Sequence, residues 1–186
     1  MSEALEQHEE AAHQADHGRR KSALLIAVLA AGLAFSEQAA QHASTSMSAN
    51  AIAATDLWAQ YQAKSIRAAQ TGAMADLAEV TAPAGPARDA LVAKLRAEVT
   101  HFEADPVTGK NAIATLAKTK EGARDTAHIR LQAYENASAA LQLGIVLTTA
   151  AVITGADALV WAASGLGLLG AVLGLAGLFR PEWAAF

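Results

Sequence analysis

The C-terminal sequence ASAALQLGIVLTTAAVITGADALVWAASGLGLLGAVLGLAGLF, residues 137–179, decides the fold. Only Gln142, Asp157 and a few serines and threonines interrupt its apolar side chains. A helix crosses a bilayer with about 20 apolar residues, and this stretch is about twice that long. Its middle, Gly155-Ala156-Asp157, has the composition of a turn. We therefore predict, within residues 138–179, a hairpin of two transmembrane helices over residues 139–156 and 158–179.

Another apolar run, residues 23–35, lies near the N-terminus. As a helix it is about 20 Å long, which is less than the roughly 30 Å of a bilayer core. A run of this length also suits the apolar part of a secretory signal peptide. The long acidic segment before it and a poor cleavage site at residues 41–43 argue against a signal peptide. We favour an uncleaved first transmembrane helix over residues 21–41.

Basic residues near the ends of these helices predict the orientation, because Lys and Arg concentrate on the cytoplasmic side of membrane proteins. Residues 19–21 are Arg-Arg-Lys, and no further Lys or Arg follows until Lys64. The acidic leader, residues 1–20, is therefore predicted to be cytoplasmic and residues 42–137 to be extracytoplasmic. The C-terminal tail, residues 180–186, is placed outside as well.

The composition excludes several classes of protein. The chain has 186 residues, of which 53% are hydrophobic and 17% charged, and it contains no cysteine. It is therefore neither a disulfide scaffold nor a thiol enzyme, and it has no cysteine zinc site. A net charge of −4 gives no basic surface for nucleic acid. Abundant alanine with few β-branched runs predicts an all-α fold.

Two loop signals divide the extracytoplasmic segment into helices. Prolines 83 and 86 form one signal, and residues 105–109 form the other. Because proline ends helices, we predict one helix to about residue 80, a second over residues 87–104, and a third from residue 110 into the second transmembrane helix. The first helix and the last two have similar lengths, about 66 and 75 Å. They are expected to form an antiparallel, coiled-coil-like hairpin, the predicted stalk.

The stalk has thin apolar faces. Its predicted packing residues are Trp58, Tyr61, Leu91, Leu95, Val99, Phe102, Leu131 and Tyr134, and alanine fills much of the remainder. Trp58 is expected to lie near Tyr134 on the opposite arm. Isolated helices depend on tertiary packing for their stability, so a single hairpin of this kind is marginal. We therefore predict a homo-oligomer whose stalks bundle above the lipid bilayer.

Residues 56–67, DLWAQYQAKSIR, resemble a segment of an uncharacterised bacterial family of small three-span membrane proteins, the domain of unknown function 4337 type. The resemblance implies a three-span architecture and location in the bacterial inner membrane, and it implies no activity. The chain departs from the family at residues 154–157, where members tend to be basic. Within this segment, Trp58 and Tyr61 with Gln62, Lys64 and Arg67 could form a patch for a partner, but packing inside the stalk is favoured.

The last transmembrane helix is rich in glycine. Gly165, Gly167 and Gly170 match the glycine spacing of a dinucleotide-binding loop, but no strand precedes them and their surroundings are apolar. No cofactor is predicted. Small residues allow helices in lipid to approach closely. The residues predicted to form such a helix-packing face are Gly167, Gly170, Gly174 and Gly177.

Two groups of polar residues are candidates for ion binding. His13 and His17, four residues apart in the leader, are weak metal candidates, but a solvated acidic leader is the favoured interpretation and no metal is predicted. Glu37, Gln38 and Gln41 lie near the outer end of the first transmembrane helix. They could line a cation-attracting pore in an oligomer, or the carboxylate could extend into the membrane interface.

No catalytic triad and no catalytic carboxylate pair can be inferred from the sequence, so we predict that the protein is not an enzyme. The favoured function is a structural, scaffolding or interaction role for a membrane-anchored homo-oligomer. A small ion channel with Glu37 in its pathway is the alternative. A further alternative is an accessory subunit of a larger membrane complex, whose partner the sequence does not identify.

Overall fold

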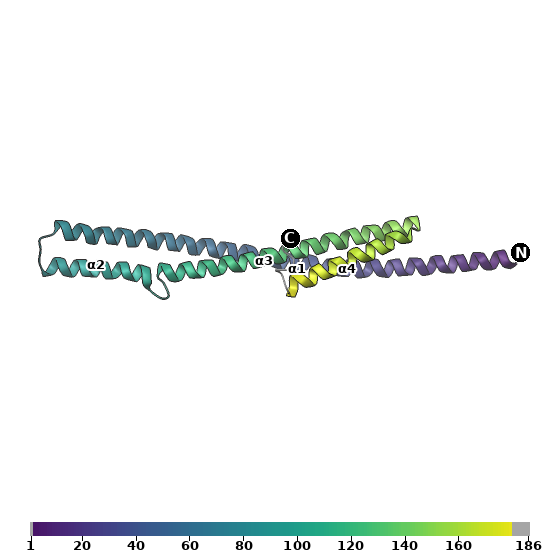
Figure 1. Cartoon of the computed structure of the whole chain (residues 1–186), viewed down its shortest axis with the longest axis horizontal. Helices are drawn as coiled ribbons and strands as arrows, with labels where there is room; N and C mark the ends of the chain where they lie inside the picture. Colours follow the sequence, from purple (N-terminus) through teal and green to yellow (C-terminus); the bar gives the residue numbers. More distant parts are fainter. Residues whose placement is uncertain (1, 180–186) are drawn as a thin grey trace. The chain divides into compact units, whose positions relative to one another are not determined.

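The computed structural model describes the backbone of residues 2–179 and the side chains of residues 20–179. This part of the chain forms four helices and contains no strand (Figure 1). The helices are α1 (Ser2–Thr81), α2 (Pro86–Ala104), α3 (Lys110–Thr154) and α4 (Asp157–Phe179). The all-α prediction is confirmed.

Three of these helices are long and apolar enough to cross a membrane, as the sequence predicted. They are α1 over its part Arg20–Thr81, α3 and α4. The first candidate segment continues without a break into the rest of α1, and the second is the C-terminal part of the continuous helix α3. The predicted spans are therefore portions of longer helices, except for α4.

Glycine and proline set the helix ends. Gly155, between α3 and α4, has a φ of 69°, in the left-handed region that favours glycine. Pro86 begins α2, where its missing N–H leaves no helical hydrogen bond unmade. Gly109 precedes α3, and a Cβ there would lie 2.5 Å from the carbonyl oxygen of Asp105, so this turn requires glycine.

The chain divides into two compact units. Unit 1 comprises Met1–Thr45 and Thr126–Phe186, and unit 2 comprises Ser46–Asp125. Unit 2 is thus shorter than the predicted stalk, residues 42–137. Both α1 and α3 contribute residues to each unit, whereas α2 belongs to unit 2 and α4 to unit 1.

In unit 2, α1 contacts α2 and α3 in antiparallel order. Arg96 of α2 pairs with Glu79 near the end of α1, with 2.5 Å between Nη2 and Oε2. Earlier in α1, the indole Nε1–H of Trp58 donates a hydrogen bond to Oε1 of Glu121 in α3 at 2.9 Å. Glu79, late in α1, thus meets residue 96, whereas Trp58, earlier in α1, meets residue 121. This order is the one that antiparallel helices require.

The interior of unit 2 consists mainly of alanine. Its buried apolar side chains are Ala54, Ala68, Ala75, Ala117 and Ile113. Within α2 no residue is fully buried. Alanine permits close approach of helices but removes little apolar area from water, so the packing inside unit 2 is thin.

Candidate functional site

The glycines of α4 bring the three helices of unit 1 together. A Cβ at Gly170 would lie 2.8 Å from Cγ of Leu141 and 3.1 Å from the carbonyl oxygen of Ala137, both in α3. At Gly177 it would lie 3.0 Å from Cβ of Ala133. Helices α3 and α4 therefore approach each other closely at these two positions, and a side chain on α4 would require its neighbours on α3 to shift.

The other two predicted packing glycines face α1. A Cβ at Gly167 would lie 2.5 Å from Cδ2 of Leu29. At Gly174 the nearest atom would be Oγ of Ser36 at 3.9 Å, which is an ordinary contact distance. All four glycines thus lie against neighbouring helices of unit 1, and Gly167 and Gly170 leave the least room.

A polar groove of about 410 Å³ lies between α1 and α3 in unit 1. On α1 its polar residues are Glu37, Gln41 and Ser44, and on α3 they are Glu135, Ser138 and Gln142. The first set is spaced by four and three residues and the second by three and four. Each set therefore lies on one face of its helix. The groove lined by these six polar residues is called the acidic groove.

Two carboxylates of the acidic groove face it without a basic partner. Among the side chains described, residues 20–179, no Lys, Arg or His lines the groove. Gln142 donates a long hydrogen bond from Nε2 to Oε1 of Glu37, at 3.4 Å. This hydrogen bond links α1 to α3 directly. The second carboxylate, Glu135, has no basic residue beside it among the described residues that line the groove.

Ser138 is the buried polar residue of the groove. Its side chain is 9% exposed, and its Oγ has no hydrogen-bond partner in the described part of the chain. Buried hydroxyl groups are normally hydrogen-bonded, often to the carbonyl one turn earlier when they lie in a helix. Thr148, ten residues further along α3, follows that rule by donating to the carbonyl of Gly144 at 2.8 Å. Ser138 therefore retains an unused donor and acceptor beside the two carboxylates.

The sequence identified part of this groove. Glu37 and Gln41 line it as neighbours, whereas Gln38 lies outside it and contacts His42, with 3.1 Å between the two side-chain nitrogens. Ser44, Glu135, Ser138 and Gln142 were missed. The last three are spaced by three and four residues where the C-terminal apolar run begins, which was a signal, but only the pairing of α1 with α3 shows which face they share.

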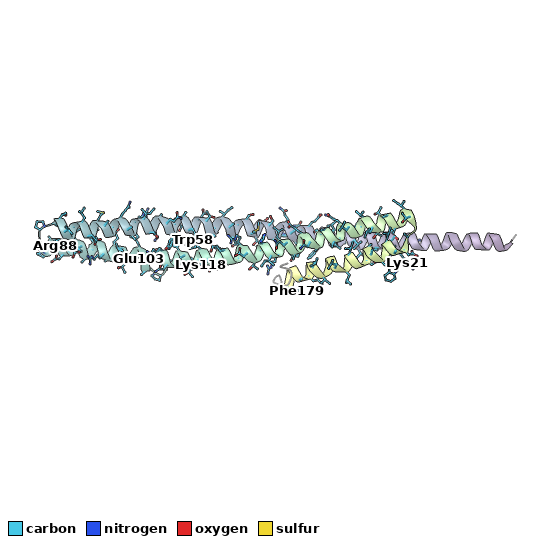
Figure 2. All side chains as sticks on the ribbon, turned by 45° about the horizontal axis from the view of Figure 1, so that its top comes forward. Lys21, Trp58, Arg88, Glu103, Lys118 and Phe179 are labelled. Carbon is cyan, nitrogen blue, oxygen red and sulfur yellow. The ribbon has the colours of Figure 1, made fainter. Side chains whose placement is uncertain are left out.

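Trp58 and Tyr61 form an aromatic pair in unit 2, with ring centroids 5.5 Å apart at 79°. Both are half-buried, and the hydrogen bond from Trp58 to Glu121 ties α1 to α3. In the same unit Lys110 contacts Glu103 at 2.6 Å, and this hydrogen bond raises the pKa of Lys110. Figure 2 labels Trp58 on α1 and Glu103 on α2. The aromatic pair of Trp58 and Tyr61 therefore belongs to the packing between helices. Gln62 and Arg67 are exposed, and Lys64 is half-buried.

The expected neighbour of Trp58 was wrong. Its partner on α3 is Glu121, about 20 Å along the helix from Tyr134. Tyr134 is buried in unit 1, where a Cβ at Gly177 would lie 3.2 Å from its ring. Leu131 lines the acidic groove. These two residues therefore pack in unit 1 and not between the arms of unit 2.

The predicted apolar stripe of α2 is only half-covered. Leu95, Val99 and Phe102 are half-buried, and Val99 approaches Gly72 of α1. Leu91 is 47% exposed. The stripe thus faces α1 at its C-terminal end and is open to its surroundings near Leu91.

The model of the family DUF4337, a domain of unknown function, matches residues 19–180. The chain belongs to this family. No curated protein and no solved structure matches it in the corresponding comparisons.

The DUF4337 match spans the helices that form the acidic groove and those that form unit 2. Among the residues whose side chains are described, no group of three or more His, Cys, Asp or Glu residues could hold a metal ion. The weak candidates His13 and His17 lie outside the described side chains. The acidic groove, with two carboxylates, two amides and two hydroxyls, is therefore the strongest candidate site in this member of the family.

Proposed function

We propose that this DUF4337 protein is a membrane-anchored helical protein that self-associates through one face of α1 and has a structural or interaction role. The face lies in unit 2 and its residues recur every three or four positions, as in a coiled coil. All of them are exposed and none is charged. This outer face consists of Ser48, Ile52, Thr55, Ala59, Gln62, Ile66, Gln70, Ala73, Leu77 and Val80.

The outer face lies opposite the packing face of the same helix. At 3.6 residues per turn, Ile66 and Leu77 point away from the side on which the buried Ala68 and Ala75 meet the other arm of unit 2. Figure 2 shows side chains on α1 that point away from α2 and α3. On the part of α1 in unit 2, then, small side chains lie inside and large apolar side chains lie outside.

The exposure of these side chains is the observation that carries the proposal. Ile66 is 58% exposed, Leu77 62% and Val80 84%. The outer face runs for about 48 Å, and an exposed apolar surface of this kind typically marks an interaction site. The absence of charge gives it no means of selecting an oppositely charged partner, whereas a second copy offers a matching surface.

Anchoring in one membrane favours a parallel arrangement of the copies. The three candidate membrane helices of each chain hold every copy in the same orientation. Equivalent residues of the outer face are then brought to the same height. We place the N-terminus in the cytoplasm and unit 2 outside the inner membrane of a bacterium, on the basis of the Arg-Arg-Lys sequence at residues 19–21.

The mass of the full chain in a mild detergent tests this proposal. Native mass spectrometry of the wild-type chain should show an oligomer, and Ile66→Glu should shift it toward monomer by placing a charge in the apolar contact. Gln60→Glu is the matched control, because Gln60 is exposed on the same helix about 120° from Ile66. A wild-type monomer at all protein concentrations, or equal effects of both substitutions, would contradict self-association through this face.

A small oligomeric ion channel is the second candidate, and the two unpaired carboxylates of the acidic groove favour it. Liposomes containing the protein should then conduct cations, and Glu37→Gln should reduce the flux or change its selectivity. An unchanged flux in Glu37→Gln would exclude this residue from the pathway. The third candidate, an accessory subunit of a larger complex, would be favoured by a wild-type monomer that co-purifies with a second membrane protein.

A further inference from the structure

We propose that the acidic groove of unit 1 binds one hydrated divalent cation, Mg²⁺ or Ca²⁺. The site lies within a single chain, so it does not depend on the self-association proposed above. Its donors come from α1 and α3, at the polar end of the apolar segments of both helices. The cation would link these two helices where the structure provides one long hydrogen bond, Gln142 to Glu37.

The donor set favours a hard cation. Glu37 and Glu135 supply carboxylate oxygens, Gln41 supplies an amide oxygen and Ser138 supplies a hydroxyl. Carboxylate, amide and hydroxyl oxygens are the ligands of Mg²⁺ and Ca²⁺, and the absence of thiol and imidazole in the described groove disfavours zinc and copper.

The charge of the groove favours a divalent ion. Glu37 and Glu135 together carry two negative charges, and none of the described residues that line the groove is basic. Both carboxylates are exposed, and like charges that line one groove repel each other. A divalent cation would neutralise both carboxylates at once, whereas one monovalent cation would leave a negative charge in the groove.

Ser138 is a second and independent indication of a ligand. Its hydroxyl lines the same groove, is almost completely buried and is unpartnered in the part of the chain whose side chains are described. An unpartnered buried hydroxyl is costly. A cation, or a water molecule from its hydration shell, would provide the missing interaction.

The size of the groove favours a hydrated ion. A water molecule occupies about 30 Å³ in the liquid, so a groove of 410 Å³ has room for a cation with several waters. Mg²⁺ commonly keeps part of its hydration shell and binds through one or two carboxylates. Direct coordination by all six polar residues is therefore not required.

Calorimetric titration of the full chain in an uncharged detergent tests the site. MgCl₂ and CaCl₂ are the probes, and NaCl at matched ionic strength is the reference. We expect one divalent ion per chain and a raised unfolding midpoint. Affinity should fall by about tenfold or more in Glu37→Gln and in Glu135→Gln. The matched control is Glu98→Gln, because Glu98 is an exposed carboxylate of unit 2. This variant should bind the divalent ion with the affinity of the wild type.

Ser138→Ala distinguishes a ligand from a merely structural residue. Without divalent ions this substitution should raise the unfolding midpoint, because it removes an unpaired buried hydroxyl. With divalent ions it should weaken their affinity, so its two effects have opposite signs. The proposal fails if the wild-type chain gives no divalent-specific heat, if NaCl raises the midpoint equally, or if the groove variants behave like Glu98→Gln. The wild-type titration decides the question even if a variant does not fold.

Discussion

Units 1 and 2 both join their helices through small residues, but they differ in the side chains that fill their interiors. In unit 1 the glycines of α4 admit Leu29, Leu141 and Tyr134 into the interior, and all three are buried. In unit 2 alanine occupies the interior, and Ile66 and Leu77 point outward. Unit 1 therefore buries large apolar side chains in its interior, whereas the thin interior of unit 2 leaves Ile66 and Leu77 uncovered.

The comparison also bears on solvent. Exposed apolar side chains on α3 and α4, such as Val146, Trp161 and Leu168, suit a helix surrounded by lipid. The outer face of unit 2 belongs to a segment whose charged residues, among them Lys64 and Asp76, are typical of a surface in water. Exposed apolar side chains there carry a cost that lipid would not impose, and burial against a second copy would remove it.

The largest expected effect comes from filling the alanine interior of unit 2. Ala75→Leu should lower the free energy of unfolding of unit 2 by about 3 kcal/mol, because Ala75 is almost completely buried and a larger side chain would overpack the interior. Hydrogen-exchange mass spectrometry of the full chain would measure this loss in unit 2 separately from unit 1. Ala73→Leu is the control, because Ala73 is exposed on the outer face. Equal loss of protection in both variants would remove the distinction between the two faces of α1.

A somewhat smaller effect is expected in unit 1. Gly170→Ala should destabilise it by about 2 kcal/mol, because the new methyl group meets Leu141 and the backbone of Ala137. Gly165→Ala is the control, since a Cβ there has no neighbour within 4 Å. If amide hydrogen exchange in unit 1 of the Gly170→Ala variant is slower or unchanged, close glycine contacts do not stabilise this unit.

The helix ends of both units could be predicted from the sequence, because proline and glycine act locally. The predicted helix over residues 87–104 is α2, Pro86–Ala104, and the predicted start at residue 110 is the start of α3. The turn at Gly155 was likewise identified from its own residues. These features depend on backbone conformation within a few residues, which the sequence determines directly.

The pairing between helices could not be predicted in the same way. Glu37 meets Gln142, a residue 105 positions away in the chain, and nothing near Glu37 specifies that register. Alanine lies on several sides of α1 and α3, so apolar periodicity does not distinguish their faces. Half of the acidic groove, and the true environments of Leu131 and Tyr134, depended on this information.

A third prediction concerns the partly buried hydrogen bond from the indole of Trp58 in α1 to Glu121 in α3. Trp58→Phe should cost about 1.5 kcal/mol in unit 2, because it removes the hydrogen bond to Glu121 while it keeps an aromatic ring beside Tyr61. Glu121→Gln retains an acceptor oxygen and should cost less. Hydrogen exchange in unit 2 measures both. Equal costs would show that the carboxylate charge, and not the hydrogen bond, matters at this contact.

The smallest effect is expected at the turn between α2 and α3, where unit 2 depends on a carboxylate and not on apolar packing. The backbone N–H of Thr108 and that of Val107 donate to Oδ1 of Asp105 at 2.5 and 3.0 Å. These hydrogen bonds, with a further bond from the hydroxyl of Thr108, lower the pKa of Asp105 from 3.8 to about 2. The folded pKa is below the ordinary value, so the contribution to stability is fully present above about pH 4. It is lost as the pH falls through 2.

Exchange of the amides of Val107 and Thr108 should therefore accelerate between pH 4 and pH 2, beyond the intrinsic pH dependence of amide exchange. Asp105→Ala should exchange quickly at both pH values, because it has no carboxylate to accept these bonds. Asp89→Ala is the control, since Asp89 is an exposed carboxylate of the same unit that pairs with Arg88. An unchanged pH dependence in Asp105→Ala would show that glycine and proline alone hold this turn. The electrostatic contribution to unit 2 would then lie elsewhere, in pairs such as Arg96 with Glu79.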